Sequence, residues 1–278
     1  MTRFRATLAY DGTAYAGYQV QPDQPTVQGQ LENALARILK TPTTVYAAGR
    51  TDTGVHATGQ VIAFDAEWKH GDATLLKAVN SQLPDDIALQ DITQQADFHP
   101  RFDALSRTYR YTVAVIDVRQ PLLAKRAWQM QQPLDINLLQ RAAMMLVGEH
   151  DFATFGQPPQ GNNTVRHVFH SVWQQHSGAD ASLPYTTYVY EVRATAFLYH
   201  MVRRMVGMQI AVGSGRITLD AFEQIFHNCD LSKAKWFAPP HGLSLTHVAY
   251  PPAGISRREY YQTQRQVTDG ASSPSEVR

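Results

Sequence analysis

The segment Ala48-Gly-Arg-Thr-Asp-Thr-Gly-Val-His-Ala-Thr-Gly-Gln60 places charged side chains in a glycine-rich loop between two predicted strands. Arg50, Asp52 and His56 fall within seven residues. The glycines relieve steric limits on the backbone, so a carboxylate on this loop can approach a ligand closely. Arg50 lies two residues before Asp52, on the same side of an extended segment. Its guanidinium can keep the carboxylate ionised or bind a phosphate through two hydrogen bonds.

The loop taken alone leaves a second interpretation open. Asp52 can instead cap backbone amides in a tight turn, with Arg50 paired to a surface acid. We interpret His56 as a structural residue that orients the loop. The residues on either side of the loop therefore have to decide between a ligand site and a turn.

Apolar periodicity predicts strands and helices on both sides of the loop. Arg3 to Tyr10 alternates, with Phe4 and Leu8 on the apolar face. Thr26 and Asp135 are each placed to cap a helix with an apolar stripe. The predicted strands are 3–10, 45–48, 60–64, 87–92, 107–115, 164–175, 185–194 and 244–250, and the predicted helices are those capped by Thr26 and Asp135 together with 72–83, 198–212 and 219–227.

The order of these elements repeats once, with a boundary near residues 96 to 106. It predicts an α+β fold of two lobes whose mostly antiparallel sheets join edge to edge, with helices on the outer faces and a central cleft. The N-terminal lobe, 1–103, carries the loop 48–60, and the C-terminal lobe covers 104–252. Residues 253–278 form a polar tail, and we expect its last part, about ten residues, to be disordered.

Cysteine and apolar content exclude several classes of protein. The single cysteine, Cys229, cannot form an intramolecular disulfide, which favours a reducing, cytoplasmic setting. The first residues lack the continuous apolar stretch of a signal peptide. No window approaches the roughly 18 apolar residues of a membrane span, so no membrane association is expected. We assign no metal, because the histidines do not cluster and His167 and His170 would face opposite sides of a predicted strand.

The distribution of charge is more informative than its sum. A formal net charge of +1 gives no support for nucleic-acid binding. Residues 192–219, however, contain arginines and no acid, and residues 101–126 are mainly basic. Such stripes can hold phosphates, although a solvated, salt-bridged face is the alternative. The basic residues concerned are Arg101, Arg107, Arg110, Arg119, Lys125, Arg126, Arg193, Arg203, Arg204 and Arg216.

The segment Gly49–Ala57 closely resembles the signature of the bacterial tRNA pseudouridine synthase A family, which reads Gly-Arg-Thr-Asp-Ala-Gly-Val-His-Ala. Thr53 departs from it where alanine is usual, and residues 156–164 also depart from the family pattern. The resemblance covers about residues 3 to 252. The other matching stretches, in the family's order, are Tyr10–Tyr18, Thr26–Glu32, Phe98–Ala104, Arg107–Tyr111, Gly148–Phe152, Phe197–Arg203 and Gly242–Leu245.

The resemblance implies an isomerase that converts uridine to pseudouridine at positions 38, 39 and 40 of the tRNA anticodon stem-loop. It implies a homodimer that works without cofactor or metal. Asp52 matches the catalytic aspartate, and Tyr109 matches the tyrosine that contacts the flipped base. Arg203 matches the arginine that pairs with the aspartate, and Arg50 the arginine implicated in base flipping. Leu245 matches an apolar residue packed in the same pocket.

The chemistry of this reaction explains why such residues are needed. The N1–C1′ bond breaks, the uracil turns, and it rejoins the sugar through C5, after extrusion of the base at a cost of a few kcal/mol. Asp52 can attack C1′, attack C6 or remove a sugar proton, and the sequence leaves these routes open. Each requires an ionised carboxylate in a buried site, for which Arg203 is the expected counter-charge. Tyr109 offers an aromatic face and a hydroxyl that can help remove the C5 proton.

Other functions fit the residues less well. Asp52-Thr53-Gly54 is the triplet of aspartic proteases. One copy per chain would need a dimer to supply the second aspartate, and the predicted helices do not fit the all-β fold of those enzymes. An RNA-binding protein without catalysis has no use for Asp52, Tyr109 and Arg203 together. A methyltransferase or NTPase is disfavoured because no Gly-x-Gly-x-x-Gly or Walker-type loop is present.

Overall fold

A computed structural model describes residues 1–177, 185–252 and 254–262. Within these ranges the chain forms one mixed sheet, in the strand order β4-β1-β3-β10-β5-β9-β8-β7, with β2 beside β3 and β6 beside β5. The strands are β1 Thr2–Tyr10, β2 Tyr46–Ala47, β3 His56–Ala66, β4 Ile87–Gln94, β5 Ser106–Val115, β6 Trp128–Met130, β7 Gly148–Asp151, β8 Val165–Ser177, β9 Thr186–Ala194 and β10 Leu243–Ala249. The α-helices are α1 Val27–Leu39, α2 Asp72–Asn80, α3 Ile136–Met144, α4 Met201–Gly213 and α5 Leu219–His227.

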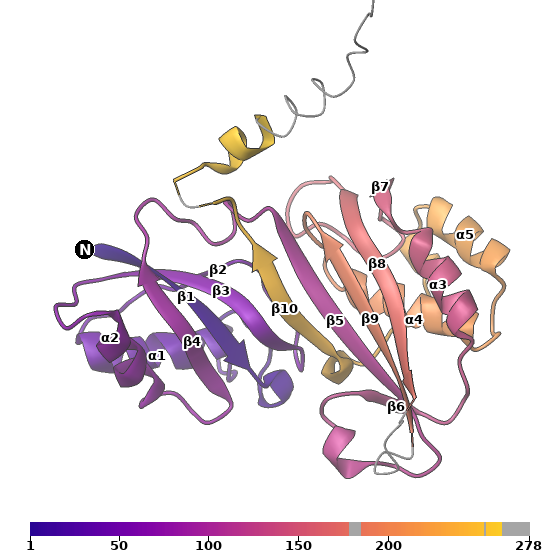
Figure 1. Ribbon diagram of the computed structural model, residues 1–278, viewed down its shortest axis with the longest axis horizontal. Helices are drawn as coiled ribbons and strands as arrows, with labels where there is room; N and C mark the ends of the chain where they lie inside the picture. Colours follow the sequence, from indigo (N-terminus) through magenta and orange to yellow (C-terminus); the bar gives the residue numbers. More distant parts are fainter. Residues whose placement is uncertain (178–184, 253, 263–278) are drawn as a thin grey trace, which may run out of the picture.

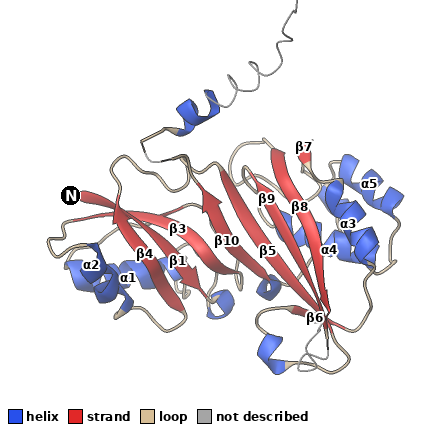
Figure 2. Cartoon of the chain, in the orientation of Figure 1, coloured by secondary structure: helices blue, strands red, loops and turns tan. Residues whose placement is uncertain are grey.

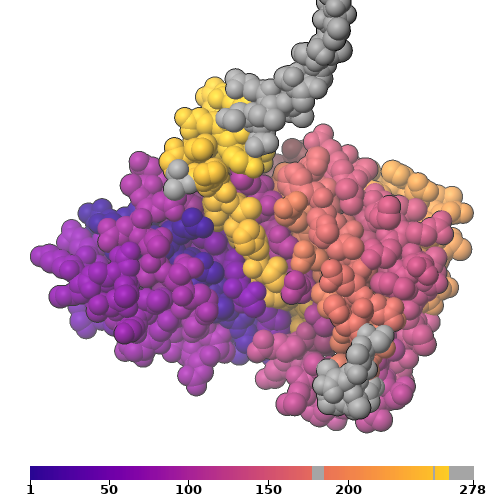
Figure 3. Space-filling model, in the orientation of Figure 1, coloured from indigo at the N-terminus to yellow at the C-terminus, as the bar shows by residue number. Residues whose placement is uncertain are grey.

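The last strand, β10, joins the two halves of the sheet. It pairs in parallel with β3, where Ser244 lies opposite His56, and antiparallel with β5, where Leu245 lies opposite Tyr109. Figure 1 shows β10 between the two groups of strands, and its residues run across the middle of the surface in Figure 3. The predicted α+β class with a mostly antiparallel sheet is confirmed.

Two apolar cores lie on either side of β10. One packs α1 and α2 with β1, β3 and β4, and includes Phe4, Leu8 and Leu31. The other packs α3, α4 and α5 with β5, β8 and β9, and Figure 2 shows these helices grouped at the opposite end of the sheet. Leu245, on β10, belongs to the first core although it comes near the end of the chain. The division into lobes at residue 103 stays a prediction.

Several element boundaries differ from the predicted ones. Helix α4 begins at Met201 rather than 198, because His200 adopts a left-handed backbone with φ 63° and ends the extended segment before it. Helix α2 ends at Asn80 because the amides of Gln82 and Leu83 both turn back to one carbonyl. Strand β3 begins at His56 rather than 60, so the loop is shorter than expected.

The sequence pattern missed two short strands. Strands β6 and β7 are too short to show an alternating pattern. Met201, Met205 and Met208 of α4 are buried. No helix in the described part of the chain has the length and apolar content to cross a membrane. The predicted disordered end of the tail lies outside the described residues.

Candidate active site

A cleft of about 810 Å³ opens where the two halves of the sheet meet. One wall is the loop Gly49–Thr53 with the segment Ala16–Gln19 beside it. The other is the segment Ala196–Arg203, which runs from the end of β9 into helix α4. Tyr109 of β5 forms part of the floor. The cleft therefore brings together residues from distant parts of the sequence.

The loop that carries Asp52 is fixed by hydrogen bonds on both sides. Tyr18 donates its backbone amide to the carbonyl of Thr51 at 3.0 Å, and Val55 donates to the carbonyl of Asp52 at 3.1 Å. The hydroxyl of Tyr10 lies 2.7 Å from the hydroxyl of Thr51. Gly17 has φ 103°, and a Cβ there would lie 3.0 Å from the Thr51 carbonyl, so the close approach requires glycine. Asp52 is therefore held in a fixed position.

Arg107 of β5 ties this loop to the second half of the sheet. Its side chain is buried, and its guanidinium donates to three backbone carbonyls: those of Ala48 at 2.9 Å, Thr195 at 3.0 Å and Arg101 at 2.8 Å. Ala48 precedes the Asp52 loop and Thr195 precedes the opposite wall of the cleft. A single side chain thus sets the relative position of both walls.

The carboxylate of Asp52 faces two side chains of the opposite wall. Its Oδ2 atom lies 3.6 Å from Nε2 of His200 and 3.8 Å from Nη1 of Arg203. Arg203 is itself oriented, because its Nε donates to the carbonyl of Ala238 at 2.9 Å and its guanidinium lies 3.9 Å from the ring centroid of Phe237. Among the described residues, no backbone amide donates to the Asp52 carboxylate. The turn-cap interpretation of this aspartate is therefore wrong.

Burial and charge compete at this carboxylate. Burial raises the pKa of Asp52 above its ordinary value, and the neighbouring His200 and Arg203 oppose that rise. Burial also lowers the pKa of His200, against the attraction of Asp52, while Arg203 and Arg204 lower it further. An imidazole with a lowered pKa is neutral near pH 7, so Arg203 supplies the permanent positive charge at the site.

Tyr109 presents its ring at the floor of the cleft. The ring packs edge-on against Phe197 with centroids 5.1 Å apart. Burial is the main cause that raises the pKa of the Tyr109 hydroxyl, and the charge of Asp52 adds to it, so this hydroxyl is protonated at neutral pH. Its backbone pairs with Leu245, which is fully buried in the core rather than part of the cleft lining. The lining from β10 is Leu243.

Arg50 lines the cleft but does not pair with Asp52. Its side chain is exposed, and within the described ranges it makes no ion pair or hydrogen bond. The spacing allowed Arg50 either to keep the Asp52 carboxylate ionised or to bind a phosphate. Arg203, on the other wall of the cleft, faces the carboxylate instead. The guanidinium of Arg50 is therefore an exposed cation on the lining of the cleft.

The basic stripes seen in the sequence are dispersed in the fold. Arg107 is buried, Arg110 pairs with Glu191 at 3.0 Å, and Arg126 pairs with Asp11 at 3.2 Å. These three residues are therefore buried or paired, and phosphate binding by the two stripes stays a prediction. The described cleft is lined by five arginines, of which Arg101, Arg107 and Arg203 belong to the stripes and Arg50 and Arg166 do not.

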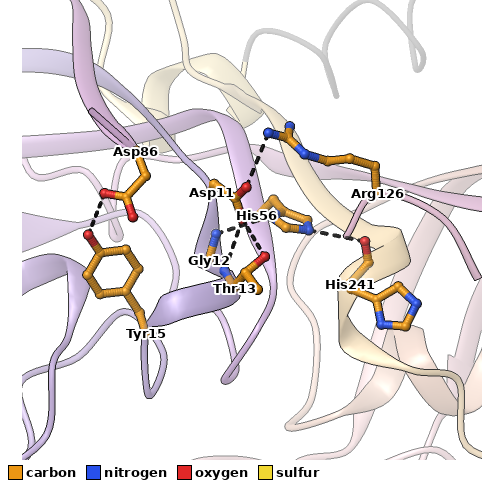
Figure 4. Close-up of polar contacts among 8 residues, drawn as sticks. All are labelled: Asp11, Gly12, Thr13, Tyr15, His56, Asp86, Arg126 and His241. Carbon is orange, nitrogen blue, oxygen red and sulfur yellow. Dashed lines mark hydrogen bonds and ion pairs between the residues drawn. The ribbon is translucent and has the colours of Figure 1, made fainter. Parts of the chain in front are cut away.

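His56 lies outside the cleft lining and has a structural role, as expected. Its Nδ1 accepts the amide of Gly12 at 3.1 Å, and its Nε2 lies 3.1 Å from the carbonyl of His241. Figure 4 shows this histidine between the turn that holds Asp11 and the segment before β10, with Arg126 reaching Asp11 from a third segment. The cluster joins the two halves of the molecule beneath the cleft loop.

Comparison with known proteins agrees with this geometry. The family model described as tRNA pseudouridine synthase matches residues 6–103 and 142–251. A tRNA pseudouridine synthase A from Paraburkholderia phymatum is 39% identical over 254 residues, which cover 90% of this chain and 92% of that protein. One from Neisseria meningitidis serogroup C is 40% identical over 259 residues, covering 92% and 95%.

This chain belongs to the tRNA pseudouridine synthase family. The segments matched to the family model include Arg50, Asp52 and Arg203, whereas Tyr109 lies between the two matched segments. Membership of this family and the mixed fold exclude the aspartic-protease alternative. Thr53, which departs from the family signature, is exposed on the loop.

Sequence reasoning missed His200 in this member of the tRNA pseudouridine synthase family. The residue lies one helical turn before Arg203, and a spacing of three is the signal that would place both side chains on one face of a helix. In the predicted helix, which begins at residue 198, this spacing already places His200 on the face of Arg203, so the signal was present in the sequence. In the structure His200 precedes the helix and turns toward Asp52.

Proposed function

We propose that this chain isomerises uridine to pseudouridine at positions 38, 39 and 40 of the tRNA anticodon stem-loop, with Asp52 as the essential carboxylate. The observation that carries the proposal is the buried Asp52 facing Arg203 in a cleft that Tyr109 also lines. Family membership supports the reaction, and the name of the similar proteins supports tRNA as substrate.

The reaction requires the target base to leave the RNA helix. In our proposal Arg50, which is exposed on the lining of the cleft, fills the space left by the extruded uridine and holds the distorted backbone. A guanidinium suits this task because it binds phosphate through two hydrogen bonds and also stacks on bases. The extruded uracil then lies against the face of Tyr109.

Asp52 acts while ionised. The N1–C1′ bond breaks, the uracil rotates and C5 bonds to C1′; the C5 proton leaves to solvent and N1 takes up a proton, so that the product is an isomer of the substrate. Attack on C1′, attack on C6 and removal of a sugar proton all use the same charged carboxylate. Arg203 supports that charge against burial. The protonated hydroxyl of Tyr109 can hydrogen-bond the uracil and assist the transfer of the C5 proton. Leu245 supports Tyr109 from the neighbouring strand.

The remaining parts of the proposal rest on the resemblance. We propose a homodimer that works without cofactor or metal in the cytoplasm, where tRNA is modified. Sedimentation of the purified protein tests the dimer, and activity after treatment with a chelator tests the independence from metal. A sedimentation coefficient of a monomer across the working concentration range would remove the dimer from the proposal.

Tritium release tests the reaction directly. The wild-type protein, incubated with tRNA that carries 5-tritiated uridine, is expected to release label to water, whereas Asp52→Asn releases none and still binds the tRNA. Asp65→Asn is the matched control, because Asp65 pairs with Arg3 at 2.6 Å outside the cleft lining and its loss leaves release intact. Binding by the wild type without any release would favour an RNA-binding protein without catalysis.

A further inference from the structure

A cluster of aromatic rings lies on the cleft wall, apart from the residues assigned above. Tyr46 lies beside His99 with ring centroids 5.6 Å apart, and His99 stacks on Phe102 at 4.2 Å with an angle of 29° between planes. All three residues line the cleft. We call Tyr46, His99 and Phe102 the aromatic platform. It is continuous with the site of Asp52 but takes no part in the chemistry proposed there.

Phe102 presents an unusually accessible ring. Its exposed fraction is 63%, and that of Tyr46 is 42%. An exposed aromatic ring on a cleft wall keeps its apolar surface in contact with water unless a ligand covers it. Arg101 lies with its guanidinium carbon 5.9 Å from the Phe102 centroid, so a cation accompanies the open ring.

The platform is held rigid before any ligand arrives. Nδ1 of His99 accepts the amides of Arg101 at 3.1 Å and of Phe102 at 3.2 Å. The carboxylate of Asp103 accepts the amide of His99 at 2.7 Å, and Arg107 holds the carbonyl of Arg101. Because the loop is fixed by these bonds, little conformational entropy is lost when a ligand stacks on it.

The charge of the cleft identifies the kind of ligand. Among the described lining residues five are arginines, and Asp52 is the only acid. That balance fits a polyanion. Aromatic rings beside a basic groove are the usual means of binding unpaired nucleotides, because every base offers a flat face and every nucleotide a phosphate.

We propose that Phe102, supported by His99 and Tyr46, is a stacking subsite for an unpaired nucleotide of the RNA, next to the uridine that enters the cleft. This inference rests on the proposed function. The subsite binds any of the four bases, because stacking makes no hydrogen bonds to the base edges. It adds affinity and register, while Asp52 and Arg203 carry the chemistry.

Variants of Phe102 test the subsite through tRNA binding. Phe102→Ala is expected to weaken binding about tenfold or more, the usual effect of losing one stacked base, whereas Phe102→Trp retains affinity. The dependence of affinity on salt stays as in the wild type, because no charge is removed, whereas Arg101→Ala lowers that dependence. Phe169→Ala is the matched control, since Phe169 is also exposed and has Arg193 over its ring at 5.6 Å, but it lies outside the cleft lining.

An RNA series with one abasic nucleotide at a time through the anticodon loop locates the stacked base. At one position the abasic RNA should bind the wild type more weakly by a factor similar to that of Phe102→Ala, with no further loss in Phe102→Ala itself. Equal losses in both proteins at every position would overturn the subsite, as would unchanged tRNA affinity of Phe102→Ala.

Sedimentation and tritium release show whether the platform binds RNA or a second copy of this chain, and whether the subsite or the whole proposed function fails. A change in sedimentation of Phe102→Ala without a change in tRNA affinity would assign the platform to contact between copies of this chain and overturn the proposal. If the wild type releases tritium and Phe102→Ala binds tRNA normally, the subsite alone fails. If the wild type neither binds tRNA nor releases tritium, the proposed function fails with it. Thermal unfolding should not change, because Phe102 is largely exposed.

Discussion

The Oδ2 atom of Asp52 lies 3.8 Å from Nη1 of Arg203, and the two residues reach this contact from opposite halves of the chain. The side chains are largely buried, with exposed fractions of 18% for Asp52 and 11% for Arg203. A buried carboxylate is costly to ionise, and a nearby guanidinium lowers that cost. The contact explains how an aspartate can remain charged in a site that excludes most of the solvent.

Loss of Arg203 should shift the pH dependence of activity. In the proposed mechanism activity requires ionised Asp52, so it falls as the pH falls through the pKa of that carboxyl. Arg203→Ala removes an opposing positive charge, so the raised pKa of Asp52 rises further and the acid limb of the pH–rate profile moves to higher pH. We also expect a loss of activity of about 100-fold at neutral pH, because the carboxylate loses its positioning partner. Tritium release measured across pH checks both.

Arg204→Ala serves as the control for charge alone. Of the neighbouring charges, Arg204 lowers the pKa of Asp52 least, and its guanidinium lies 5.1 Å from the ring centroid of Phe237. Its removal should move the acid limb in the same direction by a smaller amount. Equal shifts in Arg203→Ala and Arg204→Ala would contradict a specific pairing.

Stability should depend on pH through Asp52 with a defined sign. Because its pKa is higher in the folded state than the ordinary value of 3.8, the folded protein binds more protons than the unfolded chain between the two values. Its contribution to stability therefore falls as pH rises through that window. Asp52→Asn has no ionisable group at this position and does not lose stability as the pH rises. Its melting temperature should therefore exceed that of the wild type above this pH range and approach it below. Thermal unfolding of both proteins from acid to neutral pH measures the effect.

His200 should report the charge of Asp52 in solution. Burial lowers the pKa of His200 below its ordinary value of 6.5, and the Asp52 carboxylate partly restores it. We expect the imidazole to titrate below 6.5 in the wild type and at a still lower pH in Asp52→Asn, because the variant lacks the anion that favours the imidazolium. Histidine resonances followed by NMR across pH give both midpoints. A higher midpoint in the variant would show that the 3.6 Å contact does not form.

Arg107 should stabilise the fold far more than its neighbour on β5. Arg107→Met leaves the buried carbonyl of Ala48 without its donor, at a cost of about 1–3 kcal/mol, and also removes the partly buried hydrogen bonds to Thr195 and Arg101. Arg110→Met removes a solvent-exposed pair with Glu191, which contributes about 0–1 kcal/mol. Denaturant unfolding of both variants measures the difference. Similar losses in the two proteins would show that Arg107 does not hold the cleft walls together.

The predicted elements that agree with the structure have strong local signals. Thr26 accepts the amide of Gly29, and Asp135 accepts those of Asn137 and Leu138, as expected of helix caps. The alternation of β1 is matched by its burial, with Phe4 and Leu8 inside. Such features depend on neighbours within one or two turns, so the order of residues is enough to locate them.

The sequence by itself determined the family, the α+β class and the loop on which Asp52 stands, because these depend on a local motif and on periodic burial. The resemblance already implied that Arg203 pairs with Asp52, whereas only the tertiary structure added His200 and separated Arg50 from the aspartate. Arg50 is two positions away in the chain yet makes no pair with it, whereas His200 and Arg203 approach it across the cleft. The physical reason is that β10 enters the sheet between β3 and β5, and this long-range pairing brings the two halves together. No local pattern specifies such a contact.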